Sequence, residues 1–206
     1  MKNKQRTILC VLIATVFLML LMGNTALADD DTYYFDNYDT EAAWEHTPED
    51  MVDGSENTFA GTNQSATQLC DDNSYSSGEP GTITKVEIRA KASYSINQAP
   101  LILQPIFDGV NGAEYNFTNP PEHPNANWSD WFDITGDEMG PGVDRWEWTD
   151  IATLDCNVTA RYVGSFELHC SIVQLLVTYT PVEVHDKKTE DKKRGKQKKL
   201  FPSSIF

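Results

Sequence analysis

Regular alternation of apolar and polar residues in the middle of the chain limits the fold more than any other feature. One segment has an apolar residue at every second position and a charged residue between each pair: Val86, Ile88, Ala90 and Ala92. Successive side chains of a β-strand point to opposite faces, so a period of two predicts a strand with one buried face. The same period recurs from about residue 83 to 179, which predicts an all-β chain.

Turn signals divide this span into several strands. Residues 108–112 contain Gly109 and Gly112 and predict a hairpin between the segments 101–107 and 113–118. The last long segment changes its apolar phase near Ser171 to Val173, as a β-bulge or a change of sheet would require. Helical signals are limited to single turns. We therefore predict an antiparallel two-sheet sandwich of the jelly-roll type.

The first 28 residues have the order of a secretory signal. Basic residues come first, an apolar run follows over 8–22, and the small-x-small sequence Ala26-Leu27-Ala28 closes the segment. The apolar run is shorter than the roughly 20 residues that a membrane-spanning helix needs. We expect cleavage after Ala28 and export of a mature chain that begins at Asp29, without a transmembrane segment. A retained N-terminal anchor is the alternative.

Charge separates the expected mature chain into two parts. Residues 29–182 hold 27 acidic and five basic side chains, whereas residues 183–206 hold four acidic and eight basic ones. We predict a β-sandwich domain over 29–182 and a disordered basic tail over 183–206. The acidic body should repel nucleic acid. The acidity of the body is compatible with a solvated surface, a high-salt habitat or calcium binding. The basic tail is compatible with a solvated segment or a contact arm for an acidic partner.

Export would leave three cysteines in an oxidising compartment, and we expect one disulfide and one remaining thiol. A tight turn that places Ala160 opposite Phe166 also places Cys156 opposite Cys170. This register matches apolar residues and brings two sulfur atoms together, so we predict the disulfide Cys156–Cys170. Cys70 would then be a buried thiol or an intermolecular link. The chain also has four candidate N-glycosylation sites, at Asn63, Asn116, Asn127 and Asn157.

Several short motifs resemble those of discoidin-type, galactose-binding-like jelly rolls. The Asp-Gly turn and Thr-aromatic strand of 53–60, with Trp44 before them and the Ile-x-x-Val-x-Ile strand of 81–88 after them, are similar to the entry of such domains. Phage and archaeal surface jelly rolls end in segments similar to 148–154 and 173–179. The resemblance extends over the fold-defining parts of the body. It implies a non-catalytic binding or structural module.

The resemblance also implies a calcium site. Jelly rolls of this type often hold a structural calcium ion in the Asp-Gly loop, which maps to Asp53, and Asp71 and Asp72 are further candidates from their place in the sequence. Calcium binds six to eight oxygen atoms, mostly of carboxylates and backbone carbonyls. An Asp53 that simply begins a turn is the alternative.

Four tryptophans flank the two Gly- and Pro-rich loops of the second half, where a sandwich exposes its loops: Trp128, Trp131, Trp146 and Trp148. Aromatic rings stack on sugar rings and also fill cores, and we take all four as candidate binding residues. The pair Trp146 and Trp148 shares a strand face, which favours core packing. Trp128 and Trp131 would face opposite sides of a strand, so that at least one of them is exposed.

Enzyme motifs are absent from the sequence, which has no Gly-x-Ser-x-Gly elbow, no His-Glu-x-x-His and no phosphate-binding glycine-rich loop. The four histidines lack zinc spacing, and His169 is expected to point outward from a strand. We predict a secreted or cell-surface, non-catalytic module that binds an extracellular glycan or surface polymer. The alternatives are an assembly subunit of a surface layer, filament or virion, and a polysaccharide-cleaving enzyme.

Overall fold

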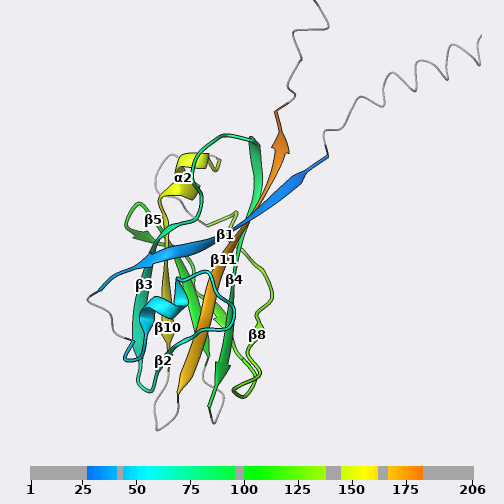
Figure 1. Ribbon diagram of the computed structural model, residues 1–206. Coiled ribbons are helices and arrows are strands. Elements are labelled where there is room, and N and C mark those ends of the chain that lie inside the picture. Colours follow the sequence, from blue (N-terminus) through cyan, green and yellow to red (C-terminus); the bar gives the residue numbers. More distant parts are fainter. Residues whose placement is uncertain (1–26, 41–43, 96–99, 138–144, 162–166, 183–206) are drawn as a thin grey trace, which may run out of the picture. The chain divides into compact units, whose positions relative to one another are not determined.

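The computed structural model describes five stretches of the chain, residues 27–40, 44–95, 100–137, 145–161 and 167–182 (Figure 1). The expected signal sequence and basic tail, and the expected turn between Ala160 and Phe166, lie outside these stretches. Residues Leu27–Pro181 form one compact unit. Within the described stretches, no helix has the length and apolar character needed to cross a membrane.

The described secondary structure is almost entirely β. The strands are β1 (Asp29–Tyr38), β2 (Ala60–Thr62), β3 (Ala66–Asn73), β4 (Gly81–Tyr94), β5 (Leu101–Phe107), β6 (Val110–Asn111), β7 (Tyr115–Phe117), β8 (Asn127–Trp128), β9 (Phe132–Asp133), β10 (Leu154–Ala160) and β11 (Leu168–Pro181). The helical elements are the 3-10 turn η1 (Pro48–Met51) and the short helix α2 (Trp148–Ala152).

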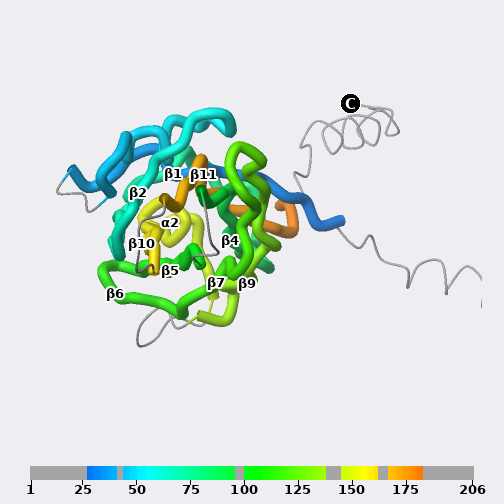
Figure 2. The backbone as a smooth tube through the Cα atoms, turned by 90° about the horizontal axis from the view of Figure 1, so that it is seen from below, coloured from blue at the N-terminus to red at the C-terminus, as the bar shows by residue number. Residues whose placement is uncertain are grey.

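The strands follow one hydrogen-bonded path in the order β6-β5-β10-β3-β1-β11-β4-β8, and β2, β7 and β9 attach to β11, β5 and β4. Strand β1 joins the two halves of this path (Figures 1 and 2). Its first part, from Asp29 to Tyr34, pairs with β11, whereas its last part, from Phe35 to Tyr38, pairs with β3. All pairings between these strands are antiparallel.

Apolar side chains from both halves of the path form a single buried cluster. Val86 and Ile88 enter it from β4, Val158 enters it from β10, and Phe35 enters it where β1 changes partner. Burial of each such side chain contributes about 1.5–3 kcal/mol. The predicted all-β, antiparallel fold is confirmed, and the alternation read from the sequence is what lets the two halves pack against each other.

Two local predictions are also confirmed. Strand β5 pairs with both β6 and β7 in the way expected of a hairpin. Strand β11 pairs with β4 along its whole length, and the register shifts between Cys170 and Ile172, which is the expected bulge.

The predicted disulfide Cys156–Cys170 is wrong. Strand β10 pairs with β3 and β5 and not with β11, so Ala160 lies opposite Ala66 and Leu101. The prediction assumed that strands consecutive in sequence are neighbours in the sheet. In the structure β10 and β11 belong to the two opposite halves, where their apolar faces contribute to the same core.

All three described cysteines are free and buried. Cys70 lies opposite Cys156 in the β3–β10 register, and its thiol donates a hydrogen bond to Met51 Sδ over 3.5 Å. Burial raises the pKa of the Cys156 thiol to about 12, and burial likewise raises the pKa values of Cys70 and Cys170. These side chains therefore act as small apolar residues of the core at neutral pH.

Candidate functional site

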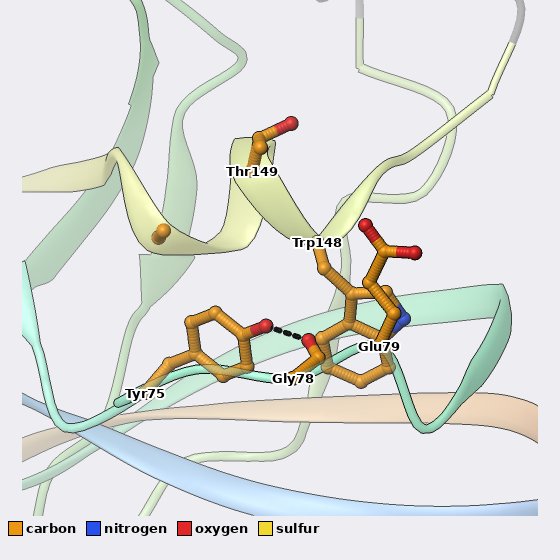
Figure 3. Close-up of a pocket in the computed structure, with 6 residues that line it drawn as sticks. Tyr75, Gly78, Glu79, Trp148 and Thr149 are labelled. Carbon is orange, nitrogen blue, oxygen red and sulfur yellow. Dashed lines mark hydrogen bonds between the residues drawn. The ribbon is translucent and has the colours of Figure 1, made fainter.

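A pocket of about 430 Å³ opens beside α2 and is the site drawn in Figure 3. Its lining residues come from the β3–β4 connection and from α2: Tyr75, Gly78, Glu79, Trp148, Thr149 and Ala152. We call it the aromatic pocket. A second pocket of about 280 Å³ shares Glu79, Trp148 and Thr149 with it, and its lining also includes Arg145, Trp146 and Glu147. The shared residues make the two pockets neighbours.

Helix α2 places Trp148 in this site. The backbone N–H of Glu147, just before the helix, donates a hydrogen bond of 2.6 Å to Asp150 Oδ2, and the N–H of Asp150 donates one of 3.0 Å to the carbonyl of Glu147. This local arrangement begins the helix at Trp148. Trp148 and Ile151, three residues apart, are the two side chains of α2 that are buried.

The aromatic floor of the pocket is held by contacts on several sides. The rings of Tyr75 and Trp148 are stacked, with centroids 5.5 Å apart and planes at 23°. Tyr179 meets the Trp148 ring edge-on at 5.3 Å, and Trp148 Nε1 donates a hydrogen bond of 2.7 Å to the carbonyl of Gly81. The Tyr75 hydroxyl donates to the carbonyl of Gly78 (Figure 3). Because these contacts fix both rings, a ligand would meet a preformed surface.

Polar groups of the pocket come from exposed residues. Glu79 is exposed, and its side chain lies beside the indole of Trp148 (Figure 3). Burial and, secondarily, the charge of Glu79 raise the pKa of Tyr75, so the phenol keeps its proton at neutral pH. The site thus offers two aromatic rings, a carboxylate acceptor and the hydroxyl of Thr149. This combination suits a ligand with an apolar face and a polar rim.

The other predicted tryptophans have different surroundings. Trp146 is buried, and its Nε1 donates a hydrogen bond of 3.2 Å to the carbonyl of Thr135. Trp146 and Trp148 both pack in the core, although they also line the pockets. The strand face that they were expected to share is wrong, because Trp146 lies outside any strand and Trp148 begins α2. Trp128 and Trp131 are only half-buried.

Trp128 and Trp131 hold a guanidinium group between them. The guanidinium carbon of Arg89 lies 3.9 Å from the centroid of the Trp128 ring and 4.1 Å from that of Trp131. We call this group the Trp–Arg–Trp stack. The expectation that the two rings face opposite sides of a strand is wrong, because β8 ends at Trp128 and β9 begins only at Phe132. The chain between them is not a strand and does not alternate.

The acids proposed as calcium ligands have partners or neighbours of their own. The carboxylate of Asp53 accepts a hydrogen bond from the Ser55 N–H and another from the Thr58 hydroxyl, both of 2.7 Å. The pKa of Asp71 is raised by burial and then by the charges of Asp72 and Asp39. Among the residues the structure describes, no three His, Cys, Asp or Glu side chains are arranged to hold a metal ion. Calcium stays a prediction, to be dropped if a chelator leaves the melting temperature unchanged.

The four candidate glycosylation sites differ in accessibility. Asn63, Asn116 and Asn127 are exposed. Asn157 is half-buried in β10, which has a partner strand on each side. Glycan attachment at these residues stays a prediction.

A histidine cluster at the start of β11 was not predicted from the sequence. His169, expected to point outward, is 5% exposed, and its Nε2 lies 3.1 Å from Glu167 Oε2. Its ring contacts His123 and Phe59, each with centroids 4.6 Å away, and His46 Nε2 lies 3.9 Å from the other oxygen of Glu167. Burial lowers the pKa of His169. The residues come from four distant segments, so no local pattern in the sequence predicts that they are in contact.

Comparisons with known proteins give no family. No protein-family model matches the chain, and no curated protein matches it. A solved family two carbohydrate esterase from Cellvibrio japonicus is similar with a TM-score of 0.35 and 9% identity, over 77% of this chain and 37% of that one. Dimeric latent PorU from Porphyromonas gingivalis is similar with a TM-score of 0.33 and 5% identity, over 74% of this chain and 13% of that one. This chain thus spans well under half of either protein, and such scores carry no functional assignment.

Proposed function

We propose that this protein is a secreted or cell-surface, non-catalytic module that binds carbohydrate in the aromatic pocket. The observation that supports the proposal most is the meeting of the stacked pair Tyr75 and Trp148 with the carboxylate of Glu79 in one pocket of about 430 Å³. The resemblance to discoidin-type jelly rolls points to the same class of function, as an analogy of fold.

A sugar ring has an apolar face and polar hydroxyl groups, and the pocket offers partners for both. The C–H face of a pyranose packs on an aromatic ring, and adjacent hydroxyl groups donate hydrogen bonds to a carboxylate. Trp148 would contribute the edge of its ring. Its N–H is not available, because it already donates a hydrogen bond to the carbonyl of Gly81. Tyr75 is less buried and would make the wider contact. Because both rings are fixed before binding, little side-chain entropy is lost on contact.

A binding screen with matched carboxylate variants tests this proposal. The full-length mature protein and its Glu79→Gln and Glu122→Gln variants are applied to a glycan array, and each ligand found is measured by calorimetry. Both residues are exposed, but only Glu79 lines the pocket. We expect Glu79→Gln to weaken binding by about tenfold, since a hydrogen bond to a charged group contributes roughly 1.5–3 kcal/mol. Glu122→Gln should bind like the wild type.

The same screen separates the other two functions. Release of shorter sugars from a bound polysaccharide would show that the protein is an enzyme and not a binding module. Such an enzyme needs two carboxylates about 5 to 9 Å apart. An assembly subunit would instead form ordered multimers that dissociate when residues 183–206 are removed, and it would show no saturable sugar binding. Equal affinity of the wild type and Glu79→Gln for a glycan would contradict the aromatic pocket as the site.

A further inference from the structure

The Trp–Arg–Trp stack lies on the outward face of β4, apart from the residues that line the aromatic pocket. Alternation along β4 places Lys85, Arg89 and Lys91 on this face, between the buried residues of the same strand. These three are a majority of the five basic residues in the strongly acidic span 29–182. The basic side chains of the body are therefore concentrated on one strand.

Arg89 differs from the two lysines beside it in its partners. Lys85 Nζ lies 2.7 Å from Glu87 Oε1, and Lys91 Nζ lies 3.0 Å from Glu56 Oε2. Arg89 instead donates to a neutral acceptor, Gln174 Oε1, through Nε at 3.1 Å and Nη2 at 2.8 Å. Within the described part of the chain, no carboxylate oxygen forms an ion pair with Arg89. Among the described residues, its positive charge is thus without a counter-charge in direct contact.

One edge of the Arg89 guanidinium remains available. A guanidinium has five N–H groups, and Gln174 accepts two of them. Nη1 has no hydrogen-bond partner among the described residues. The unpartnered side-chain atoms that are fully buried there belong to other residues, so Nη1 is not fully buried. It therefore reaches solvent. The edge formed by Nη1 and the second N–H of Nη2 is the fork that binds a carboxylate through two parallel hydrogen bonds.

The electrostatic surroundings favour an anion at this edge. Burial lowers the pKa of Arg89, and among the described acids Glu56 is the one that acts appreciably on the guanidinium. Two aromatic faces stabilise a partly desolvated guanidinium through cation–π attraction. A carboxylate on the open edge would add the missing counter-charge, and an attached ring would lie against the half-buried indoles.

We infer that the Trp–Arg–Trp stack is a second binding site, specific for a carboxylate-bearing sugar such as the uronic acid of an acidic polysaccharide. Arg89 would bind the carboxylate through two hydrogen bonds, and Trp128 or Trp131 would pack against the sugar ring. The acidic body would repel a polyanion if its charges were unscreened. The Debye length is about 8 Å at physiological ionic strength, so the distant acids are largely screened while the direct contact with Arg89 persists. This site does not depend on the function of the aromatic pocket.

A matched pair of ligands and a matched pair of arginine variants test this inference. Trigalacturonate and its fully methyl-esterified form are titrated into the full-length mature protein by calorimetry in about 0.15 M salt. Arg89→Lys keeps the charge but loses the fork, and Arg161→Lys makes the same change at an exposed arginine that pairs with Glu114 at 2.6 Å. We expect the wild type to bind the acid form, Arg89→Lys to weaken it by about tenfold, and Arg161→Lys to leave it unchanged.

Two further measurements keep the result interpretable. Circular dichroism shows whether Arg89→Lys is folded, and the indole N–H signals of Trp128 and Trp131 report binding in the unaltered protein. Shifts of those two signals with trigalacturonate and not with the ester would support the site even if Arg89→Lys failed to fold. No binding of the acid form, equal binding of acid and ester, or equal losses in Arg89→Lys and Arg161→Lys would overturn it. The Glu79→Gln variant should bind trigalacturonate normally, which separates the two sites.

Discussion

Two pairs of tryptophans close together in the sequence have opposite environments in the fold. Trp146 and Trp148 are each 5% exposed, and each indole N–H donates to a backbone carbonyl. Trp128 and Trp131 are half-buried, and their rings cover a charged side chain. The first pair belongs to the apolar core and forms the wall of a pocket. The second pair converts an arginine on the outer face of a strand into a partly desolvated group.

Residue type alone does not decide what a tryptophan does. A buried indole needs a partner for its N–H, and backbone carbonyls at Thr135 and Gly81 supply it. A surface indole gains most from a cation over its face, and the alternation of β4 supplies Arg89 there. The comparison predicts unequal effects on stability and on ligand choice.

Removal of Trp148 should have the largest effect. Trp148→Ala deletes a core ring that contacts Tyr75 and Tyr179, and large-to-small core substitutions of this kind cost about 3–5 kcal/mol. Urea denaturation of the wild type and the variant measures the difference in free energy of unfolding. Trp148→Phe, which keeps a ring, should lose less. A cost below that of Trp131→Ala would contradict the core role of Trp148.

Removal of Trp131 should have a moderate effect. Trp131→Ala uncovers one face of Arg89 but leaves the core intact, so we expect a loss of about 1–2 kcal/mol. The same urea titration gives the value. The outcome that would contradict the surface role is a loss as large as that of Trp148→Ala.

Acidification should destabilise the fold through His169 and not through either tryptophan pair. Burial lowers the folded-state pKa of His169 below its usual 6.5, so the unfolded chain binds the proton more readily. The stability that His169 contributes is complete above about pH 6.5 and decreases as the pH falls below that value. Melting temperatures between pH 7.5 and 5 should fall less steeply in His169→Gln than in the wild type, and equally in Trp131→Ala and the wild type. Parallel slopes for His169→Gln and the wild type would refute this assignment.

The smallest effect is expected from an acid in β3. Burial and two neighbouring aspartates raise the pKa of Asp71, which means that its charged form is disfavoured in the folded chain. Asp71→Asn removes that charge and should raise the melting temperature at neutral pH, by less than Trp131→Ala lowers it. The gain should shrink as the pH falls through the folded-state pKa, because wild-type Asp71 then becomes neutral. A lower melting temperature for Asp71→Asn at pH 7 would contradict the unfavourable charge.

Local patterns predicted the strands and one hairpin, but not the partners of β10. Alternation in β4 and the phase change in β11 are properties of one segment, and both are present in the structure. The pairing of β10 with β3 and β5 depends on contacts between distant segments, which a local register cannot reveal. The predicted sulfur bridge failed for this reason.

The site was predictable only in part. Aromatic density near the loops pointed to Trp148, which lines the aromatic pocket. Tyr75 and Glu79 come from a different loop, and no spacing in the sequence connects them with α2. His169 was misread because alternation assigns a side of the strand but does not show that Phe59 and His123 cover that side.

Carbohydrate binding in the aromatic pocket is tested most directly by a nitrogen–proton NMR titration of the wild-type protein with a neutral glycan identified on the array. The five indole N–H signals are followed during the titration. We expect saturable shifts of the Trp148 signal, smaller shifts of Trp146, and no change for Trp44, whose Nε1 donates to the carbonyl of Val158 inside the core. A saturable titration that leaves Trp148 unmoved would contradict carbohydrate binding in the aromatic pocket.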